Sequence, residues 1–176
     1  MAYTDKTWAA NEALTASGFN TYLRDALRHL AEPDREVINI TSGTNYTTTS
    51  TSFADVNTTD YQVDLTPSIG SGQTCDILVG GMFAIRCSGD ATPAIIHFDL
   101  MVNGVSVSGA NGIFFVEGAT NQIFPVTLNY LLQGQDNSAK AIKLRWKTSD
   151  GARTATLYTQ SGGTRQARSQ FWARVL

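Results

Sequence analysis

The 176-residue chain is short of charge, since Lys, Arg, Asp and Glu make up only 16% of it, against about 25% in typical soluble domains. Its formal net charge of −2 gives no long-range field, and its basic residues are scattered rather than clustered, unlike those of a nucleic-acid or anionic-lipid site. These shortages argue against nucleic acid and membrane surfaces as partners. The many Thr, Ser, Gly and Asn residues predict instead a surface rich in hydroxyl groups.

Long apolar runs are missing as well. The longest, at 77–85 and 124–132, fall well below the roughly 20 residues that a membrane-spanning helix needs. Residues 1–8 have no apolar core of the kind that signal peptides carry. We therefore expect a protein that is made in a cytoplasm and does not insert into a membrane.

Cysteine is nearly absent, with only Cys75 and Cys87 in the chain. On one continuous strand, which rises about 3.3 Å per residue, the two would lie far beyond disulfide reach. A turn at Gly80-Gly81 would bring them closer, so both arrangements stay open. Free buried thiols are favoured because both cysteines fall on the apolar phase of the local pattern.

Catalytic groups are equally scarce, beginning with only two histidines, His29 and His97. His29 falls on the polar side of a predicted helix end, where a positive charge suits the helix dipole. Asp99 follows His97 by two residues and shares its strand face, so the two could hold a metal or a proton between them. No third ligand is placed beside them, and we expect a surface polar pair.

Motifs for enzyme chemistry are missing too: there is no phosphate-binding loop, nucleophile elbow, paired C-x-x-C or calcium-loop spacing. Carboxylates suited to sugar hydrolysis are present, but that reaction needs two of them held a few ångströms apart. The candidates are Asp55, Asp60, Asp64, Asp99 and Glu117. We expect no enzyme, no cofactor and no metal, with a glycan-degrading enzyme as a minor alternative.

One amphipathic helix is predicted near the N-terminus. Thr15 offers a hydroxyl N-cap, and the helix should run to about Ala31, where Pro33 ends it. Its apolar residues recur at spacings of three and four and form one stripe. They are Phe19, Tyr22, Leu23, Ala26, Leu27 and Leu30. This stripe would pack either on the chain's own β-domain or against copies of itself or a neighbouring protein.

From Glu36 onward the apolar period is two, which predicts strands. They are expected at 37–40, 53–56, 61–65, 75–87, 96–102, 113–116, 124–132, 142–147, 154–159 and 171–176, while 41–52 is a loop or an edge strand. The glycines inside 75–87 favour one bent strand over a tight hairpin, Asn103-Gly104 indicates a two-residue hairpin, and 142–147 should have a core face and a wet, basic face.

About eight to ten strands with no helix among them describe an antiparallel β-sandwich of jelly-roll type. The sequence thus predicts two parts: an anchor segment with its helix at 1–35, and a β-sandwich domain at 36–176. The strand at 171–176 ends the chain and is apolar on both sides, which predicts a paired, covered strand. We therefore expect Trp172 to lie in a subunit interface.

Exposed aromatics are the clearest sign of binding. Tyr46, Tyr158 and Trp172 stand near Asn, Gln and Thr residues, a combination that flat carbohydrate or protein surfaces use. Each is also a plausible core or interface residue. The pattern supports binding without locating it.

The N-terminal segment Lys6 to Leu30, KTWAANEALTASGFNTYLRDALRHL, resembles the start of many tailed-bacteriophage structural proteins. In these a Trp, a Glu and a Thr precede a helix of the form Leu/Phe-Asn-x-x-x-Arg-Asp, and a β-rich domain follows. The matching residues are Trp8, Glu12, Thr15 and the run from Phe19 to Asp25, with Phe19 where Leu is commoner. The similarity is close over about the first thirty residues and one of style beyond them.

The resemblance implies a virion protein in a tail fibre, a tail tip or a capsid-decorating appendage, usually a homotrimer. Its N-terminal segment would anchor to other virion proteins or gather three chains, while many weak outward contacts would add up to firm adhesion. The residues implied for the oligomer or anchor interface are Trp8, Phe19, Leu23, Leu27, Leu30 and Trp172. Two functions stay open: an appendage that contacts host surface glycan or protein, and a decoration protein that clamps neighbouring capsid subunits.

Overall fold

The computed structural model describes residues 15–31, 34–40, 43–89, 94–118, 121–159 and 169–176. Within them the helix α1 spans Ala16–Ala31. The strands are β1 (Arg35–Ile40), β2 (Tyr46–Thr48), β3 (Ala54–Asp55), β4 (Gln62–Leu65), β5 (Cys75–Ser88), β6 (Ala94–Val102), β7 (Val105–Ser106), β8 (Phe114–Gly118), β9 (Ile123–Gln135), β10 (Lys140–Thr148), β11 (Thr154–Tyr158) and β12 (Ser169–Val175), with a short 3-10 turn at Gly109–Asn111.

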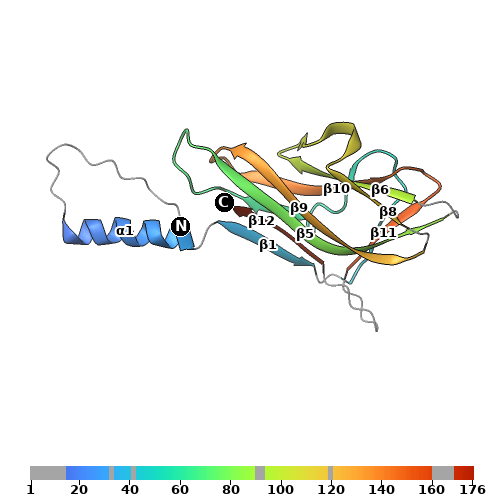
Figure 1. Ribbon diagram of the computed structural model, residues 1–176, viewed down its shortest axis with the longest axis horizontal. Coiled ribbons are helices and arrows are strands. Elements are labelled where there is room, and N and C mark those ends of the chain that lie inside the picture. Colours follow the sequence, from blue (N-terminus) through green and yellow to red (C-terminus); the bar gives the residue numbers. More distant parts are fainter. Residues whose placement is uncertain (1–14, 32–33, 41–42, 90–93, 119–120, 160–168) are drawn as a thin grey trace.

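These strands form two six-stranded antiparallel sheets that face each other (Figure 1). In sheet A, β12 and β11 pair with successive halves of one edge of β5, β1 and β2 extend the sheet beyond them, and β9 pairs with the other edge of β5. In sheet B, β10 and β6 are central, flanked by β3 and β4 on one side and by β7 and β8 on the other. The mainly β fold and the sandwich are confirmed, while the jelly-roll type stays a prediction.

The longest strand, β5, shows how the two-residue apolar period of the sequence corresponds to burial. Along β5 the residues Ile77, Val79, Phe83 and Ile85 are all buried, and the alternating residues Leu78, Met82 and Ala84 face the opposite side. The predicted single strand across the glycines is therefore confirmed. Both cysteines lie on this strand and are free thiols.

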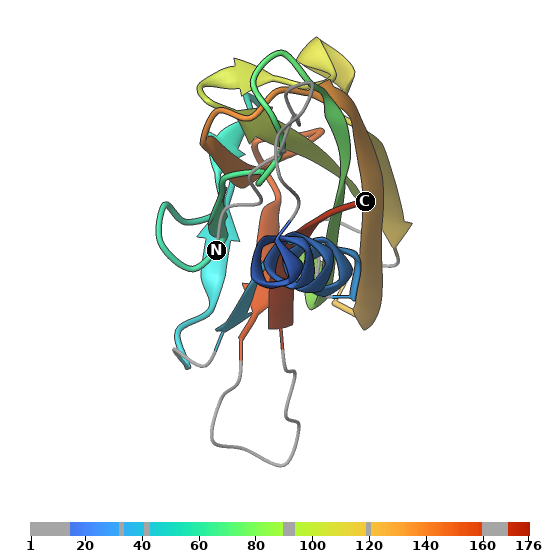
Figure 2. The same cartoon turned by 90° about the vertical axis from the view of Figure 1, so that its left-hand side faces the viewer.

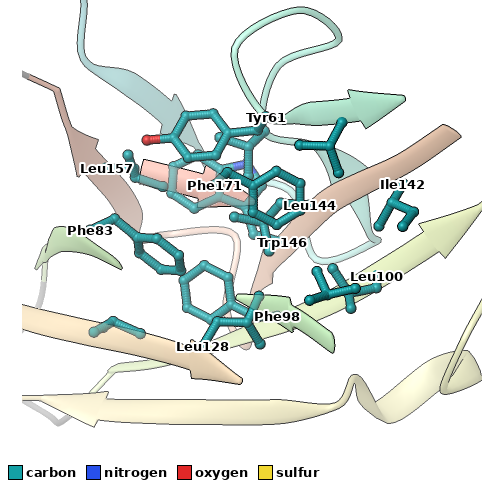
Figure 3. Close-up of a cluster of buried hydrophobic side chains, with 14 of the residues drawn as sticks. Tyr61, Phe83, Phe98, Leu100, Leu128, Ile142, Leu144, Trp146, Leu157 and Phe171 are labelled. Carbon is teal, nitrogen blue, oxygen red and sulfur yellow. The ribbon is translucent and has the colours of Figure 1, made fainter. Parts of the chain in front are cut away.

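The core fills the space between the inner faces of the two sheets (Figure 3). The Phe83 ring of sheet A packs against the Phe98 ring of sheet B with centroids 5.4 Å apart, and Trp146 is 1% exposed. Burying each large apolar side chain contributes about 1.5–3 kcal/mol. This core therefore binds the two sheets into one body.

Two local predictions are also confirmed. Asn103 and Gly104 have φ angles of 49° and 85°, the left-handed pair that a two-residue turn needs between β6 and β7. At the start of α1, the Thr15 hydroxyl oxygen accepts a hydrogen bond from the backbone N–H of Gly18 at 3.1 Å, which is an N-cap.

The structure departs from the predicted strand list in three short elements. Twelve strands occur among the described residues rather than eight to ten, because β2, β3 and β7 are only two or three residues long. Within the run 41–52, β2 is an edge strand that pairs with β11. The strand predicted at 53–56 shrinks to Ala54–Asp55. No helix in the described part of the chain has both the length and the apolar character needed to span a lipid bilayer.

Candidate functional site

Of the five anchor residues predicted in the N-terminal part, the structure describes the side chains of three. Trp8 lies outside the described residues, and Leu30 lies in α1 at a position whose side chain is not described. Phe19, Leu23 and Leu27 are 47%, 47% and 57% exposed and stand four residues apart, so they share one helix face. We call these three residues the helix stripe. Of the two partners that the sequence allowed, the chain's own β-domain does not cover the stripe.

A second uncovered apolar surface lies on the outer face of sheet A. Val37 of β1 pairs with Trp172 of β12, which in turn pairs with Gly80 of β5. In the neighbouring rows, Leu78 pairs with Leu131 of β9, and Met82 lies beyond Gly80. We call Val37, Leu78, Met82, Leu131 and Trp172 the Trp172 face.

The centre of this face depends on a glycine. An added Cβ at Gly80 would lie 2.1 Å from the nearest ring carbon of Trp172, far inside van der Waals contact. The indole ring therefore lies across the backbone of β5, and it is half-buried there. Trp172 provides a flat apolar platform on an otherwise pleated sheet.

Around this platform the apolar side chains are open to solvent. Met82 is 49% exposed, Val37 43% and Leu131 39%. Neighbouring apolar side chains on a protein surface are typical of interaction sites. The expectation that Trp172 belongs to a subunit interface stays a prediction, and the uncovered residues around it are consistent with that placement.

Strand β9 borders the Trp172 face and is unusual for an edge strand. Its thirteen residues include no Lys, Arg, Asp or Glu, and among the described residues it pairs with β5 alone. Exposed edges normally carry charge to prevent unwanted strand pairing. Strand β9 therefore lacks the charge that usually protects an edge of this length.

A cleft of about 310 Å³ opens between β9 and the β6–β7 hairpin. Its walls include Val102, Val105 and Leu131, with Tyr130 and the Gln133 amide supplying polar groups, and none of its lining residues is charged. This cleft can hold an uncharged group, and its lining residues include no carboxylate, imidazole, ammonium or guanidinium side chain. Sequence reasoning did not find it because its walls come from separate strands.

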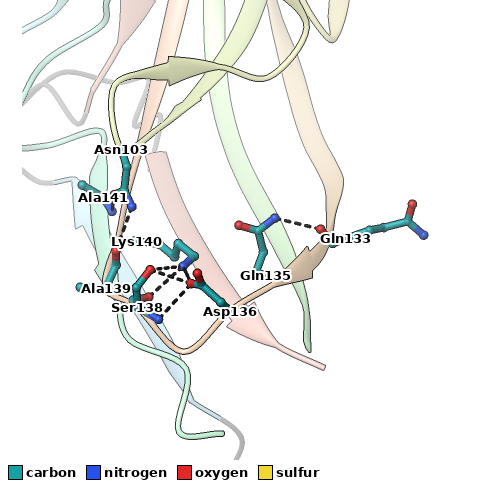
Figure 4. Close-up of polar contacts among 8 residues, drawn as sticks. All are labelled: Asn103, Gln133, Gln135, Asp136, Ser138, Ala139, Lys140 and Ala141. Carbon is teal, nitrogen blue, oxygen red and sulfur yellow. Dashed lines mark hydrogen bonds and ion pairs between the residues drawn. The ribbon is translucent and has the colours of Figure 1, made fainter. Parts of the chain in front are cut away.

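Hydrogen bonds fix the end of the cleft (Figure 4). The Asn103 side chain donates to the Ala139 carbonyl at 3.0 Å and accepts from the Ala141 N–H at 2.8 Å. Nearby, the Lys140 ammonium donates to the Asp136 carboxylate and the Ser138 hydroxyl. Lys140, followed by Ser138, holds the pKa of Asp136 well below its usual range, so this turn is an internal clamp rather than a reactive site.

The expected surface pair of His97 and Asp99 is wrong for Asp99, which is fully buried. The Asp99 carboxylate accepts hydrogen bonds from the hydroxyls of Ser106 and Ser108 at 2.6 and 2.7 Å. The His97 ring nitrogen Nδ1 lies 3.1 Å from the Asn111 carbonyl oxygen. The loop after the hairpin folds over this face of β6 and gives each residue its own partner.

The same loop changes the expected wet, basic face of β10, because its basic residues are half-buried. The Lys147 ammonium donates to the Ala110 carbonyl at 2.7 Å and lies 4.8 Å from the centre of the Phe53 ring. Arg145 donates to the Phe53 carbonyl at 2.6 Å, and Lys143 pairs with Asp55 at 3.3 Å. The chain itself thus supplies partners for the basic side chains of β10.

The three candidate binding aromatics do not form one site. Tyr46 donates a hydrogen bond to Asp60 and packs edge-on against Tyr61 with ring centroids 5.8 Å apart. The Arg86 guanidinium lies 5.8 Å from the centre of the Tyr158 ring. Trp172 belongs to a different part of sheet A, and all three candidates are half-buried.

Chemistry is sparse in the described residues. No three His, Cys, Asp or Glu side chains come together there in a way that could hold a metal ion. Burial raises the pKa of the Cys87 thiol and of the Tyr61 phenol, which makes both less reactive. The expectation that the chain is not an enzyme stays a prediction.

Part of the Trp172 face could have been found from sequence. In 76–86 the phase opposite the core includes Leu78, Gly80 and Met82, so this strand is apolar on both faces, as the final strand is. The cross-strand row from Val37 through Trp172 to Gly80 could not be found, because it depends on register between distant segments.

No protein family and no curated protein matches this chain. Among solved structures, the chain is similar to the dimeric latent form of PorU from Porphyromonas gingivalis, at 11% identity and a TM-score of 0.41, covering 82% of this chain and 13% of that one. It is also similar to VP2 of infectious bursal disease virus, at 12% identity and a TM-score of 0.43, covering 81% and 39%. The CBM22-1 xylan-binding domain from Paenibacillus barcinonensis Xyn10C gives 12% identity and a TM-score of 0.30, covering 80% and 81%. The chain thus spans well under half the length of the first two.

Proposed function

We propose that this chain is a structural and adhesive protein of a bacteriophage particle, a homotrimeric tail-fibre or tail-tip appendage that contacts the host surface. The observation that carries the homotrimer is the pair of uncovered apolar surfaces, the helix stripe and the Trp172 face. The bacteriophage setting rests on the resemblance of residues 6–30. The part of each chain before the sandwich would anchor it to other virion proteins.

Assembly would be driven by burial of the apolar surfaces. Covering a fully exposed Phe or Leu side chain contributes about 1.5–3 kcal/mol, and Phe19, Leu23 and Leu27 are each roughly half exposed. Several such residues per chain would offset the entropy lost on association. Three copies would then present identical outer surfaces together, so that weak single contacts with a host glycan or protein add up.

The same surfaces favour one alternative, a capsid decoration protein that binds neighbouring capsid subunits without contacting a receptor. The uncharged edge of β9 is the feature that suits this role best, because a long edge without charge, interrupted only by Pro125, can pair with a strand of another subunit.

The test is to locate the chain on particles purified from the phage that encodes it. Gold-labelled antibody at the tail would support the appendage, and label over the head would support the decoration protein. Absence of the chain from purified particles would contradict both functions.

Adhesion is tested separately with the fluorescently labelled full-length chain and whole host cells. The appendage should bind cells, and it should bind at least tenfold more weakly in the double variant Leu23→Asp/Leu27→Asp, because single copies lose the gain from many contacts. Binding to emptied capsids but not to cells would favour the decoration protein.

A further inference from the structure

We propose that α1 of each copy lies on the Trp172 face of the next copy, so that the two uncovered apolar surfaces of the chain cover each other. This inference rests on the proposed homotrimer and names the contact that holds it together. Its two components are the helix stripe (Phe19, Leu23 and Leu27) and the Trp172 face.

The two surfaces match in size. At 1.5 Å per residue, the sixteen residues of α1 span about 24 Å, and the seven residues of β12 span about 23 Å. The face crosses four strands, β1, β12, β5 and β9, whose three spacings add to about 14 Å. A helix about 10–12 Å in diameter covers most of that width.

A chain does not place its helix on its own face. In Figure 1, α1 extends away from the end of the sandwich, and in Figure 2 it is seen nearly end-on from that side. The chain is fixed just after the helix at Asp34, whose carboxylate accepts hydrogen bonds from the N–H and hydroxyl of Ser68 at 2.6 and 3.2 Å. The Asp34 carbonyl also accepts from the Val175 N–H at 2.8 Å. Because the stripe stays exposed on its own chain, its partner in the proposed arrangement is another copy.

A helix bundle would be the simpler way to cover the stripe, but it would leave the Trp172 face open on every copy. A helix-on-face contact uses two different patches, one from each chain, and every chain has one of each. Such head-to-tail contacts close into a ring when the rotation between copies allows it. In a ring of three, both surfaces are covered on every copy.

Charge on the face is consistent with an apolar helix stripe. Its charged side chains, Arg35 and Arg174, lie in one cross-strand row with Leu78 and Leu131. The next two rows, which contain Trp172 and Met82, carry no charged residue. A helix lying along β12 would therefore meet charged side chains of these rows only at Arg35 and Arg174, which are exposed and can keep their guanidinium groups in water.

Mixing two defective variants of the full-length chain tests this arrangement. The helix variant is Leu23→Asp/Leu27→Asp, and the face variant is Met82→Arg/Leu131→Arg; all four residues are exposed, so both variants should fold. Alone, each should have the mass of a single chain, 19.0 kDa. Mixed in equal amounts, they should give a particle of twofold mass, because the intact helix of one docks on the intact face of the other.

The matched control is Val105→Arg, a charge placed on a side chain that is 70% exposed and lies outside the Trp172 face. It should keep the mass of the unaltered chain. Light scattering over a series of concentrations, with circular dichroism to verify folding, measures all of these samples.

Three outcomes would overturn the inference. A face variant that keeps the full mass alone would show that the helices associate by themselves. A mixture that stays at the single-chain mass throughout the series would show that no helix-on-face contact forms. A single-chain mass for the unaltered chain would also contradict the homotrimer of the proposed function, whereas the first two outcomes leave that homotrimer standing.

Discussion

On the outer side of β10 in sheet B, the chain itself covers a row of basic side chains, whereas around Trp172 in sheet A it leaves apolar side chains exposed. On sheet B, Lys143, Arg145 and Lys147 all have carboxylate, carbonyl or aromatic partners from nearby loops. On sheet A, Val37 and Met82 are 43% and 49% exposed.

The two surfaces differ in what a partner molecule would do to their stability. A charged group that is already hydrogen-bonded gains little from a partner and loses hydration if one arrives. An exposed apolar group gains by being covered. The basic row of β10 therefore has its partners within the chain, and the Trp172 face of sheet A is the surface that association would stabilise.

The largest effect on stability is expected on β12, where neighbouring residues face opposite sides of sheet A. Phe171→Ala removes a fully buried ring and should lower the free energy of unfolding by about 3–5 kcal/mol. Trp172→Ala should lower it much less while reducing the solution mass. Urea unfolding and light scattering measure the pair, and equal destabilisation of dilute single chains would contradict an outward-facing Trp172.

A smaller effect is expected for Gly80→Ala, which would push the Trp172 ring off the sheet. The added Cβ would lie 2.1 Å from that ring, and overpacking of this kind costs about 1–3 kcal/mol. The control is Gly151→Ala, whose Cβ would have no neighbour closer than 3.8 Å. Thermal unfolding should separate the two variants, and equal melting temperatures would argue against the ring position described for Trp172.

On sheet B, Asp99→Ala should destabilise the fold without changing the solution mass. It leaves the hydroxyls of Ser106 and Ser108 without their buried acceptor, a loss worth about 1–3 kcal/mol. Asp99→Asn keeps one acceptor oxygen, so its free energy of unfolding should lie between those of the unaltered chain and Asp99→Ala. A reduced mass for Asp99→Ala would show that the outer face of sheet B also takes part in association.

The smallest effect concerns acid. Hydrogen bonds from Lys140 and Ser138 lower the pKa of Asp136, so its contribution to stability is present above the unfolded pKa of about 3.9 and is lost as the pH falls toward the folded value. From pH 7 to about pH 3, the unaltered chain should therefore lose more unfolding free energy than Asp136→Asn. Urea unfolding at both pH values measures these losses. Equal losses of unfolding free energy in the unaltered chain and in Asp136→Asn would contradict this clamp.

Local features of the fold could be predicted from the sequence, because they depend on neighbours in the chain. The Asn103-Gly104 turn follows from the φ angles that those residues adopt easily, and the N-cap at Thr15 follows from its hydroxyl. The long strand β5 follows from the alternation of buried residues along it.

Features that depend on distant segments could not be predicted. The burial of Asp99 requires a loop to fold back over β6, and nothing local to Asp99 indicates this. The Trp172 face requires β12 to lie between β1 and β5 in one register. For the same reason the aromatic residues Tyr46 and Trp172 could be proposed for binding but not placed.

The solution mass of the unaltered full-length chain, measured by light scattering over a series of concentrations, tests the central claim most directly. We expect a mass three times the single-chain value of 19.0 kDa. A mass that stays at the single-chain value at every concentration would contradict it, because the helix stripe and the Trp172 face would then remain exposed without a copy to cover them.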